Sequence, residues 1–519
     1  MSNIKKPTHK DTIELQNARS AFIQGNYSRA LKLFSKAVKA QPYNVLALTD
    51  AARAHGQRFE IDYAEKCVER MIKLAKANHD NPTIYFLAAQ TLRMIHRSDE
   101  ALEYFQKVVE APEPPTDVFL ELAVLLERRH NLDPALEYIE KYLLKNPQSA
   151  EAAMLKGRIL RRKGQADSTQ EIYDKMVHHR DCLPITRAQI LNEWSHLLDS
   201  QKDFTSAYEK LIESKKILQK HSETESAQQN SDNEQKWQIR LNHSVTSVDY
   251  EKWQNADTGA KQKTVLLTGC PRSGTTLIEK IIDAHPGIIS ADELGAFSSY
   301  ILPSLVKGKR DNEGYFDATT LNELSVLKIE KEAKRYYKYL ACALNESIDD
   351  RILVDKNPST TGIIAAYQRV SPQNKILYAL RDPRDVALSC FFRWLPINSV
   401  SVRYQTFEET CRRTAEELEF WLDTRDKLPA GSWLETRYED TVKDYTAESK
   451  RVLDWMGLEW DDSIEDYRNH LNQRGVNSPT YEAVNKPIYK GAIGRWKNYL
   501  PFVEEHLPIL DDVRKRLGY

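Results

Sequence analysis

A small residue recurs along the first part of the chain at intervals of 34, 37, 34, 34 and 38 residues. An apolar residue follows it four positions later each time, which places the two on one face of a helix. The pairs are Ala30 and Phe34, Ala64 and Val68, Ala101 and Phe105, Ala135 and Ile139, Thr169 and Tyr173, and Ala207 and Leu211. A period near 34 residues predicts helical hairpins stacked into an all-α solenoid, because each hairpin buries its apolar face only against its neighbours.

The first repeat resembles a known helical-hairpin pattern. Its small, aromatic and proline positions are similar to those of the tetratricopeptide repeat, and they are Ala18, Gly25, Tyr27, Ala30, Phe34, Ala37 and Pro42. We therefore expect about six such repeats over residues 12–220, with these side chains packed in the core. The resemblance implies that the array binds a protein or peptide partner.

The composition changes after the repeats. Residues 221–235 are rich in Ser, Glu, Gln and Asn, which predicts a linker or a solvated helix end. We interpret residues 221–262 as linker and short adapter. In residues 263–519, apolar runs alternate with helical stretches, an order typical of an α/β domain with a parallel sheet.

One loop of this second part has the pattern of a phosphate cradle. The run Gly269-Cys-Pro-Arg-Ser-Gly-Thr-Thr276 follows the apolar segment 264–268 and precedes the helical segment 277–282. We expect a buried strand, a glycine turn and a helix whose first amides and dipole face an anion. The C-terminal domain is thus predicted to be P-loop-like.

The loop departs from that of nucleoside triphosphatases in its cation. Gly269 and Gly274 have the usual spacing, but Thr275 stands where the phosphate-bridging lysine is required, and Arg272 lies inside the loop instead. This pattern favours a nucleotide that carries one 5′-phosphate and a transferable group.

Two other predicted strands end in charged residues. The run 352–354 leads into Asp355 and Lys356, and the run 375–380 leads into Arg381. Ligands of parallel sheets bind at the carboxyl ends of the strands, so we expect these residues near the loop. Asp355 could hold Mg²⁺, as in a nucleoside-triphosphate-dependent kinase, but the adjacent Lys356 indicates that the cation here is a side chain.

Two further basic segments follow. Ser389 and Arg393 lie one helical turn apart and could surround a phosphate together with Arg381, although such a run is also typical of a solvated turn. The run 490–497 combines two glycines with three cations and is consistent with a flap that closes over an anion.

Together these segments resemble the sulfotransferase family over about residues 264–517. The loop is similar to the family's 5′-phosphosulfate loop, Arg381 and Ser389 match its 3′-phosphate pair, and the run 490–497 is similar to its C-terminal signature. The loop arginine, with the pairs His285-Pro286 and Asp292-Glu293, resembles the protein-tyrosine sulfotransferase branch. Repeats in front of such a domain resemble bacterial tetratricopeptide sulfotransferases.

The resemblance implies 3′-phosphoadenosine 5′-phosphosulfate as the sulfuryl donor, without a metal. It implies Glu293 as general base, with helix capping as the alternative, and Arg272 and Lys356 as the cations that stabilise the leaving group. The implied donor contacts are Arg272, Ser273, Gly274, Thr275, Thr276, Arg381, Ser389, Arg393, Tyr438, Thr480, Lys490, Gly491 and Arg495. A core role is the alternative for Tyr438.

The composition limits which binding partners and which cellular compartment we expect for this chain. The 74 basic residues balance 75 acidic ones, so the chain has no global attraction to nucleic acid or an anionic membrane. No apolar run has the length of a membrane span, and the first residues lack the apolar core of a signal peptide. The six cysteines form no CxxC pair, which predicts reduced thiols and a cytoplasmic location.

Three functions remain open at this point. The first is sulfuryl transfer to a tyrosine of a protein or peptide that the repeats recruit. The second is the same reaction on a glycan, lipid or metabolite hydroxyl, because all these acceptors present the same oxygen. The third is a repeat scaffold with an inert nucleotide domain, and the intact set of charged residues argues against it. The sequence does not indicate the oligomeric state.

Overall fold

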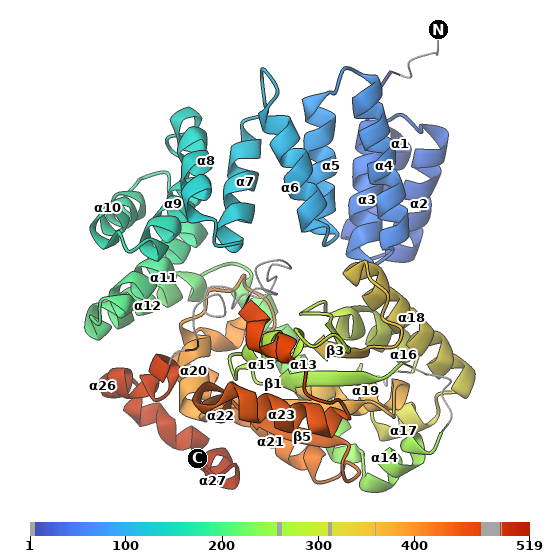
Figure 1. Cartoon of the computed structure of the whole chain (residues 1–519), viewed down its shortest axis with the longest axis vertical. Coiled ribbons are helices and arrows are strands. Elements are labelled where there is room, and N and C mark those ends of the chain that lie inside the picture. Colours follow the sequence, from blue (N-terminus) through green and yellow to red (C-terminus); the bar gives the residue numbers. More distant parts are fainter. Residues whose placement is uncertain (1–5, 257–261, 310–313, 359, 469–487, 489) are drawn as a thin grey trace. The chain divides into compact units, whose positions relative to one another are not determined.

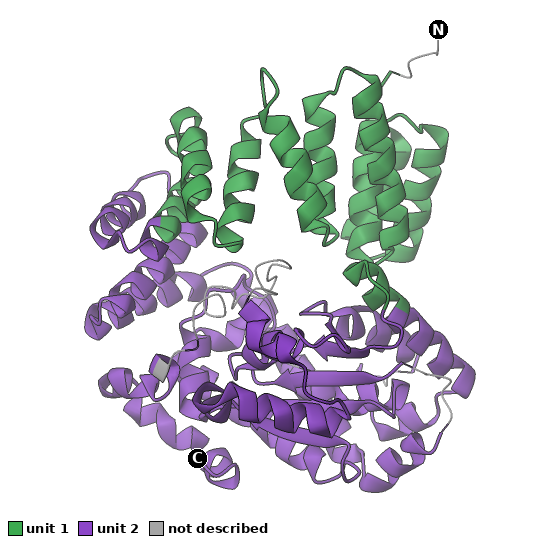
Figure 2. Cartoon of the chain, in the orientation of Figure 1, with its two compact units in different colours: residues 1–159, 338–347 green, residues 160–337, 348–519 purple. Residues whose placement is uncertain are grey.

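The computed structural model describes residues 6–256, 262–309, 314–358, 360–468, 488 and 490–519. The chain divides into two compact units, each with a core of its own. Unit 1 comprises residues 1–159 and 338–347, and unit 2 comprises residues 160–337 and 348–519 (Figure 2).

Unit 1 consists of helices that pack in consecutive pairs (Figure 1). Side-chain caps begin several of them: Asn26, Asn44 and Asn81 each accept a hydrogen bond from a backbone amide of the following helix. The helices are α1 (Ile13–Ile23), α2 (Tyr27–Ala40), α3 (Val45–Gln57), α4 (Ile61–Ala77), α5 (Pro82–Met94), α6 (Ser98–Val109), α7 (Asp117–Arg128), α8 (Leu132–Lys145) and the greater part of α9 (Ala150–Arg162).

The recurring small residues lie where the repeat pattern predicts. All six, from Ala30 to Ala207, are fully buried, and the apolar residue four positions after each is at most 3% exposed. Because a small side chain lets two helices approach closely, this burial explains why alanine recurs at these positions. The predicted core role of these twelve residues is confirmed. It is wrong for Tyr27 of the first repeat, which is 37% exposed, and for Gly25, which is also exposed.

The predicted array of residues 12–220 continues into unit 2 as α10 (Ala166–Val177), α11 (Pro184–Ser200) and α12 (Phe204–Gln219). The next segment, expected as a linker or a solvated helix end, forms α13 (Thr224–Ser244). Ala227 and Ser231, one turn apart, and Leu241 and Asn242 further on are buried. Packing of this one face therefore holds a helix whose composition is mostly polar.

A five-stranded parallel sheet with the order β2-β3-β1-β4-β5 lies at the centre of unit 2. The strands are β1 (Thr264–Gly269), β2 (Ile288–Ser290), β3 (Ile352–Lys356), β4 (Lys375–Leu380) and β5 (Trp433–Arg437). Every residue of β1 and β3 is buried, as expected of strands covered on both faces. The predicted α/β domain with a parallel sheet is confirmed.

Helices cover both faces of this sheet. On one face, β1, β3 and β4 share an apolar core with α15 (Thr275–Ile282) and α23 (Tyr445–Met456). On the other face, Tyr378 of β4 stacks on Trp421 of α21 (Phe407–Arg425), with ring centroids 4.0 Å apart, and Asp355 of β3 meets Tyr336 of α18 (Val326–Leu344).

The remaining elements of unit 2 are mostly short connections between these layers. They are α14 (Ser247–Gln254), η1 (Phe297–Ile301), α16 (Leu302–Leu305), α17 (Ala318–Asn322), η2 (Thr361–Ile363), α19 (Ile364–Val370), α20 (Pro383–Phe391), η3 (Ser401–Tyr404), α22 (Tyr438–Lys443), η4 (Asp462–Asp466), η5 (Lys490–Ala492), η6 (Arg495–Tyr499), α26 (Leu500–Val503), η7 (Glu504–Leu510) and α27 (Asp511–Arg516).

Candidate active site

The loop between β1 and α15 can be built only with glycine at two positions. Gly269 has φ 146°, and a Cβ there would lie 2.5 Å from the carbonyl oxygen of Ala379. Gly274 has φ 102°, and a Cβ there would lie 2.8 Å from the ring of Tyr438. Arg272 also adopts a positive φ, 72°, which is rare for a residue with a side chain. The loop is therefore a tight backbone cradle at the carboxyl end of β1.

One hydroxyl in this cradle is buried without an internal partner. The Ser273 side chain has no hydrogen-bond partner within the described residues, although Ser273 is only 1% exposed. Buried polar groups are nearly always hydrogen-bonded, so such a group at a loop of this shape indicates a place for a ligand oxygen. Thr275 and Thr276, which begin α15, are also buried.

Arg272 lies among the other predicted anion-binding side chains. Its Nε donates a hydrogen bond to Ser389 Oγ, 3.1 Å away, across 117 residues of sequence. Burial, and next the neighbouring Arg393, lower the pKa of Arg272 to about 10, so the guanidinium stays charged at neutral pH. Arg381 contributes to the same effect. The structure thus brings together the loop and the segment after β4.

Arg381 ties the loop to two other segments. Its Nη1 donates to the carbonyl oxygen of Arg272 at 3.2 Å, and its Nη2 donates to the carbonyl oxygen of Ala492. The guanidinium also lies over the ring of Tyr438, 4.7 Å from the centroid. Three parts of the sequence, namely the loop, the start of α22 and the segment of Ala492, therefore converge on one buried arginine.

The C-terminal signature is held by α20. Asp385 Oδ2 accepts a hydrogen bond from the Gly494 amide at 2.6 Å, and Asp385 Oδ1 accepts one from the Trp496 amide at 2.9 Å. Sequence inspection missed Asp385, whose signal was its position one helical turn after Arg381. These two bonds fix the segment after η5 beside the start of α20.

The other predicted donor contacts of the C-terminal part lie as follows. Arg495 pairs with Asp199 of α11 at 3.0 Å and lies over the ring of Phe392, and its contact with the donor stays a prediction. Lys490 and Gly491 begin η5, with Gly491 exposed. Thr480 lies outside the described residues.

The second centre of charge surrounds Lys356 at the end of β3. This lysine is fully buried, and its Nζ lies 2.7 Å from Asp292, 2.8 Å from Glu293 and 3.4 Å from Glu279. Burial would lower the pKa of Lys356, but these three carboxylates raise it well above its usual range. The Glu293 side chain is 30% exposed, whereas that of Glu279 is fully buried. Glu293 is therefore the carboxylate of this cluster that faces solvent.

Sequence inspection missed part of this cluster. Glu279 and Lys280 lie on α15 just after the loop, and both are buried. Burial raises the pKa of Glu279, while Lys280 and Lys356 oppose that rise. Burial acts in the same direction on Asp292, but Lys356 and Lys280 more than offset it, and its pKa falls below its usual range. The signal that could have indicated Glu279 was a charged pair on an otherwise apolar helix.

The two charged centres belong to one site. Parallel register sets Gly269 of β1 against Ala379 of β4 and Leu267 of β1 against Lys356 of β3. Glu293 also lies close enough to Arg272 to raise the pKa of that arginine, against the larger effect of burial. The cations Arg272 and Lys356 and the solvent-facing carboxylate of Glu293 therefore belong to one site at the carboxyl edge of the sheet.

Asp355, the one residue that favoured a magnesium site, faces away from this edge. Its carboxylate accepts a hydrogen bond from Tyr336, and burial raises the pKa of Asp355 to about 6. Its interactions thus do not support metal binding. Within the described residues, no group of three or more His, Cys, Asp or Glu side chains could hold a metal ion.

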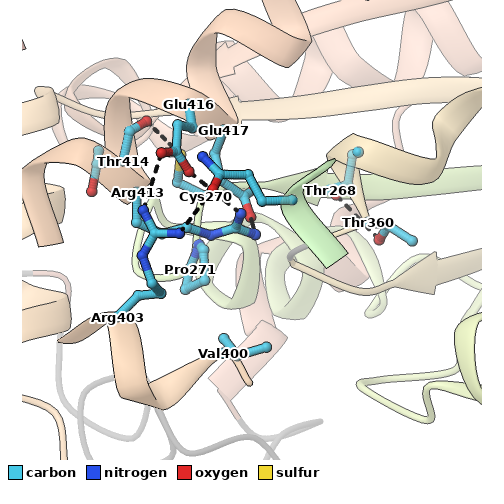
Figure 3. Close-up of polar contacts among 12 residues, drawn as sticks. Thr268, Cys270, Pro271, Thr360, Val400, Arg403, Arg413, Thr414, Glu416 and Glu417 are labelled. Carbon is cyan, nitrogen blue, oxygen red and sulfur yellow. Dashed lines mark hydrogen bonds and ion pairs between the residues drawn. The ribbon is translucent and has the colours of Figure 1, made fainter. Parts of the chain in front are cut away.

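A polar network packs behind the loop (Figure 3). Thr268 Oγ1 donates to Thr360 Oγ1 at 3.3 Å, and Cys270 Sγ lies 4.0 Å from the carbonyl oxygen of Thr414. Two arginines there pair with carboxylates of α21, the buried Arg403 with Glu416 at 3.0 Å and the partly buried Arg413 with Glu417. This network packs against the loop, and its two arginines are paired with carboxylates.

Comparison with known families identifies both parts of the chain. Residues 264–462 match the sulfotransferase family, and residues 120–174 match the tetratricopeptide repeat. The chain therefore joins tetratricopeptide repeats to a sulfotransferase-family domain, as the motifs indicated. None of the described helices is long and apolar enough to cross a bilayer.

Several curated proteins are similar to this chain. An uncharacterized protein of Aquifex aeolicus is 22% identical over 326 residues, which cover 62% of this chain and 41% of that protein. Protein-tyrosine sulfotransferase 2 of Gallus gallus is 21% identical, over 49% of this chain and 69% of that protein. Protein-tyrosine sulfotransferase A of Caenorhabditis elegans is 22% identical, over 53% of this chain and 71% of that protein. The chain thus spans less than half the length of the Aquifex relative.

Among solved structures, the sulfotransferase domain of the Synechococcus PCC 7002 olefin synthase aligns with a TM-score of 0.35 at 20% identity. The alignment covers 50% of this chain and 95% of that domain.

Proposed function

We propose that this chain transfers a sulfuryl group from 3′-phosphoadenosine 5′-phosphosulfate to an acceptor hydroxyl. The observation that carries the proposal is the convergence of Arg272, Ser389 and Arg381 on the glycine loop, with the Lys356–Glu293 pair at the same edge of the sheet. The sulfotransferase-family match over residues 264–462 supports the reaction class.

The residues present fit this donor. The buried Ser273 hydroxyl and the start of α15 suit a 5′-phosphosulfate, since both offer hydrogen-bond donors to an anion. Arg381 and Ser389 suit a second phosphate at the 3′-position. A donor with a 5′-phosphosulfate and a 3′-phosphate uses both of these phosphate positions, whereas a nucleoside triphosphate uses only the 5′-position.

In the proposed reaction the acceptor oxygen forms a bond to sulfur as the bond from sulfur to the phosphate oxygen breaks. Glu293 takes the proton of the acceptor hydroxyl, because it is the solvent-facing carboxylate of the site. Arg272 and Lys356 stabilise the negative charge that develops on the leaving phosphate, and preorganised donors of this kind contribute about 3 to 4 kcal/mol each. The products are the sulfated acceptor and adenosine 3′,5′-bisphosphate.

Lys356 also explains how Glu293 is kept in place before the donor binds. The 2.8 Å contact holds the carboxylate beside the cation. A phosphate oxygen that approaches Lys356 competes for that contact and releases Glu293 toward the acceptor. Donor binding would thereby prepare the base.

Partner and location follow as further proposals. The repeats would recruit a protein partner, and the relatives named protein-tyrosine sulfotransferases make peptide tyrosine one candidate acceptor. All six cysteines are free thiols, which supports a cytoplasmic location.

Ligand-induced thermal stabilisation tests the donor. Adenosine 3′,5′-bisphosphate should stabilise the full chain far more than ATP with Mg²⁺, since a ligand at 100 times its Kd adds about 2.7 kcal/mol. Arg381→Ala should remove most of this stabilisation, whereas Arg451→Ala, a control at a partly exposed arginine of α23, should keep it. Equal stabilisation by ATP with Mg²⁺ would contradict the proposal.

A further inference from the structure

A cleft of about 850 Å³ lies in unit 2 outside the residues assigned to the donor. One wall is α13, from Glu223 to Trp237. The opposite walls come from Ser298 to Pro303, in η1 and α16, and from Ile397 to Ser399, after α20. The volume is sufficient for a ligand of several rings.

Chain connectivity places this cleft at the edge of the active site. Ser298 follows Glu293 by five residues, and Ile397 follows Arg393 by four. The wall α13 is anchored on segments that follow the strand ends: Asn242 Nδ2 donates to the Gly362 carbonyl at 3.0 Å, and Arg403 donates to Gln235 Oε1 at 3.4 Å. The cleft is therefore suitably placed for the acceptor.

The charge of the cleft is opposite to that of the donor site. Among its described lining residues, the charged ones are both acidic, Glu223 and Glu234, and neither forms an ion pair within the described part of the chain. The other polar lining groups are amides and hydroxyls, including Asn230, Asn233 and Asn398. Such a lining repels an anionic ligand and offers many hydrogen bonds to a neutral one.

An aromatic ring completes the lining. Trp237 stacks on Phe316 behind it, with ring centroids 5.1 Å apart and planes at 29°. Its orientation is therefore set before any ligand binds. An oriented aromatic face beside amide and carboxylate oxygens is suited to a sugar ring, whose C–H face packs on the aromatic ring while its hydroxyls donate to the oxygens.

We propose that this cleft binds the acceptor and that the acceptor is a neutral, polyhydroxylated compound of the oligosaccharide class. The inference rests on the proposed sulfuryl transfer, and the bond changes are those given above, with a sugar hydroxyl as the nucleophile. An acidic tyrosine peptide is the alternative acceptor, and it is disfavoured because Glu223 and Glu234 would lie beside its carboxylates.

The test is an acceptor panel with the full chain and the phosphosulfate donor, read by mass shift. The panel contains maltotriose, triacetylchitotriose, trigalacturonate and two tyrosyl peptides, one flanked by Glu and one by Gln. We expect transfer to a neutral trisaccharide, with kcat/KM at least about tenfold above that of trigalacturonate and the acidic peptide, since one unfavourable charge contact is on the order of tenfold. No transfer to either neutral trisaccharide, or preference for the acidic peptide, overturns the proposal.

Variants then locate the binding site. Glu234→Lys should raise KM for the neutral trisaccharide and lower it for trigalacturonate, whereas Glu225→Lys, an exposed acid of α13 outside the cleft, should change neither. Trp237→Ala should raise the trisaccharide KM by roughly tenfold or more. Because that variant loses packing on Phe316, its fold is checked by thermal unfolding, and Glu234→Lys stands as the independent surface variant.

The two proposals fail in distinguishable ways. If the sulfotransferase assignment is wrong, adenosine 3′,5′-bisphosphate does not stabilise the chain. If only the acceptor assignment is wrong, that stabilisation persists while the acidic peptide is the better substrate and Glu234→Lys has the same effect as Glu225→Lys.

Discussion

Lys356 is a fully buried cation held by three carboxylates, and this arrangement sets the consequences of changing any of them. Breaking a buried ion pair leaves an uncompensated charge and typically costs about 3 to 5 kcal/mol. Asp292 and Glu279 are buried with the lysine, whereas Glu293 is partly exposed. Substitutions at Glu293 should therefore affect the reaction more than the fold.

We predict that Glu293→Gln lowers turnover by about 10² to 10⁴ while the Kd for adenosine 3′,5′-bisphosphate stays nearly unchanged. Glutamine keeps the size of the side chain but cannot accept the proton. Single-turnover kinetics and calorimetric titration measure the two quantities. Asp292→Asn is the matched control, because it removes the other short Lys356 contact, 2.7 Å, without removing the proposed base. An equal loss of turnover in both variants would assign the effect to Lys356 instead.

The buried Asp355 predicts a pH dependence of stability. Its folded-state pKa, about 6, lies above the unfolded value near 3.9, so the folded state binds more protons between these values. Stability should therefore decrease as pH rises from about 4 to about 6, by up to about 3 kcal/mol. Against the larger effect of burial, the hydrogen bond from Tyr336 and the charge of Lys356 lower the pKa of Asp355, whereas Glu279 raises it. Asp355→Asn should remove this slope in urea unfolding measured at pH 4 and pH 6, and a slope unchanged by the substitution would contradict the assignment.

The site residues illustrate what a sequence can and cannot indicate. Arg272 and Arg381 were predictable, because each follows a strong apolar run and parallel strands end at one edge. The contact between Lys356 and Glu293 was not, since 63 residues separate them and no periodicity relates the two positions. Burial of Glu279 was likewise hidden, because an acidic residue on a helix is usually solvated.

At the scale of elements, the glycine loop yields a steric prediction. Gly274→Ala introduces a Cβ at a positive φ and 2.8 Å from the Tyr438 ring, so we expect loss of both stability and donor affinity. Gly431→Ala is the matched control: its φ is 78°, but a Cβ there meets no atom within 4 Å. The Gly431→Ala control should lower the free energy of unfolding only by the cost of a left-handed backbone conformation, about 1 to 2 kcal/mol. Urea unfolding and titration with adenosine 3′,5′-bisphosphate measure the stability and the donor affinity of the two variants. Equal losses in both variants would contradict a steric clash with Tyr438.

Elements were predictable where a strong local pattern exists. The run 375–380 is β4 without any change of bounds, and the pattern of strand, glycine turn and helix holds from β1 to α15. Elements without such a pattern were not predicted, and β2 and α13 are two examples. β2 is only three residues long, Ile288–Ser290, and owes its existence to pairing with β3. α13 has a polar composition typical of disorder, and the tertiary burial of one face stabilises it as a helix.

At the scale of the whole molecule, the two units predict an independently folding fragment. The apolar core of unit 1 runs from Leu15 to Ile159, so a fragment of residues 6–162 should be helical by circular dichroism and unfold cooperatively. The longer fragment 12–220 extends the predicted repeat array into unit 2, and comparison of the two fragments locates the boundary. A disordered 6–162 fragment beside a folded 12–220 fragment would favour the boundary predicted from the sequence.

The order of the sheet also determines when it can form during synthesis. β1 is the central strand, and Leu267 lies 89 residues before its partner Lys356, while Gly269 lies 110 residues before Ala379. At 5 to 20 residues per second, the ribosome needs roughly 5 to 20 s to supply both neighbours. During that time β1, with its apolar centre and two unpaired edges, is exposed in the nascent chain. The helical repeats, whose contacts are local, can already fold. Chaperones have this interval in which to bind β1.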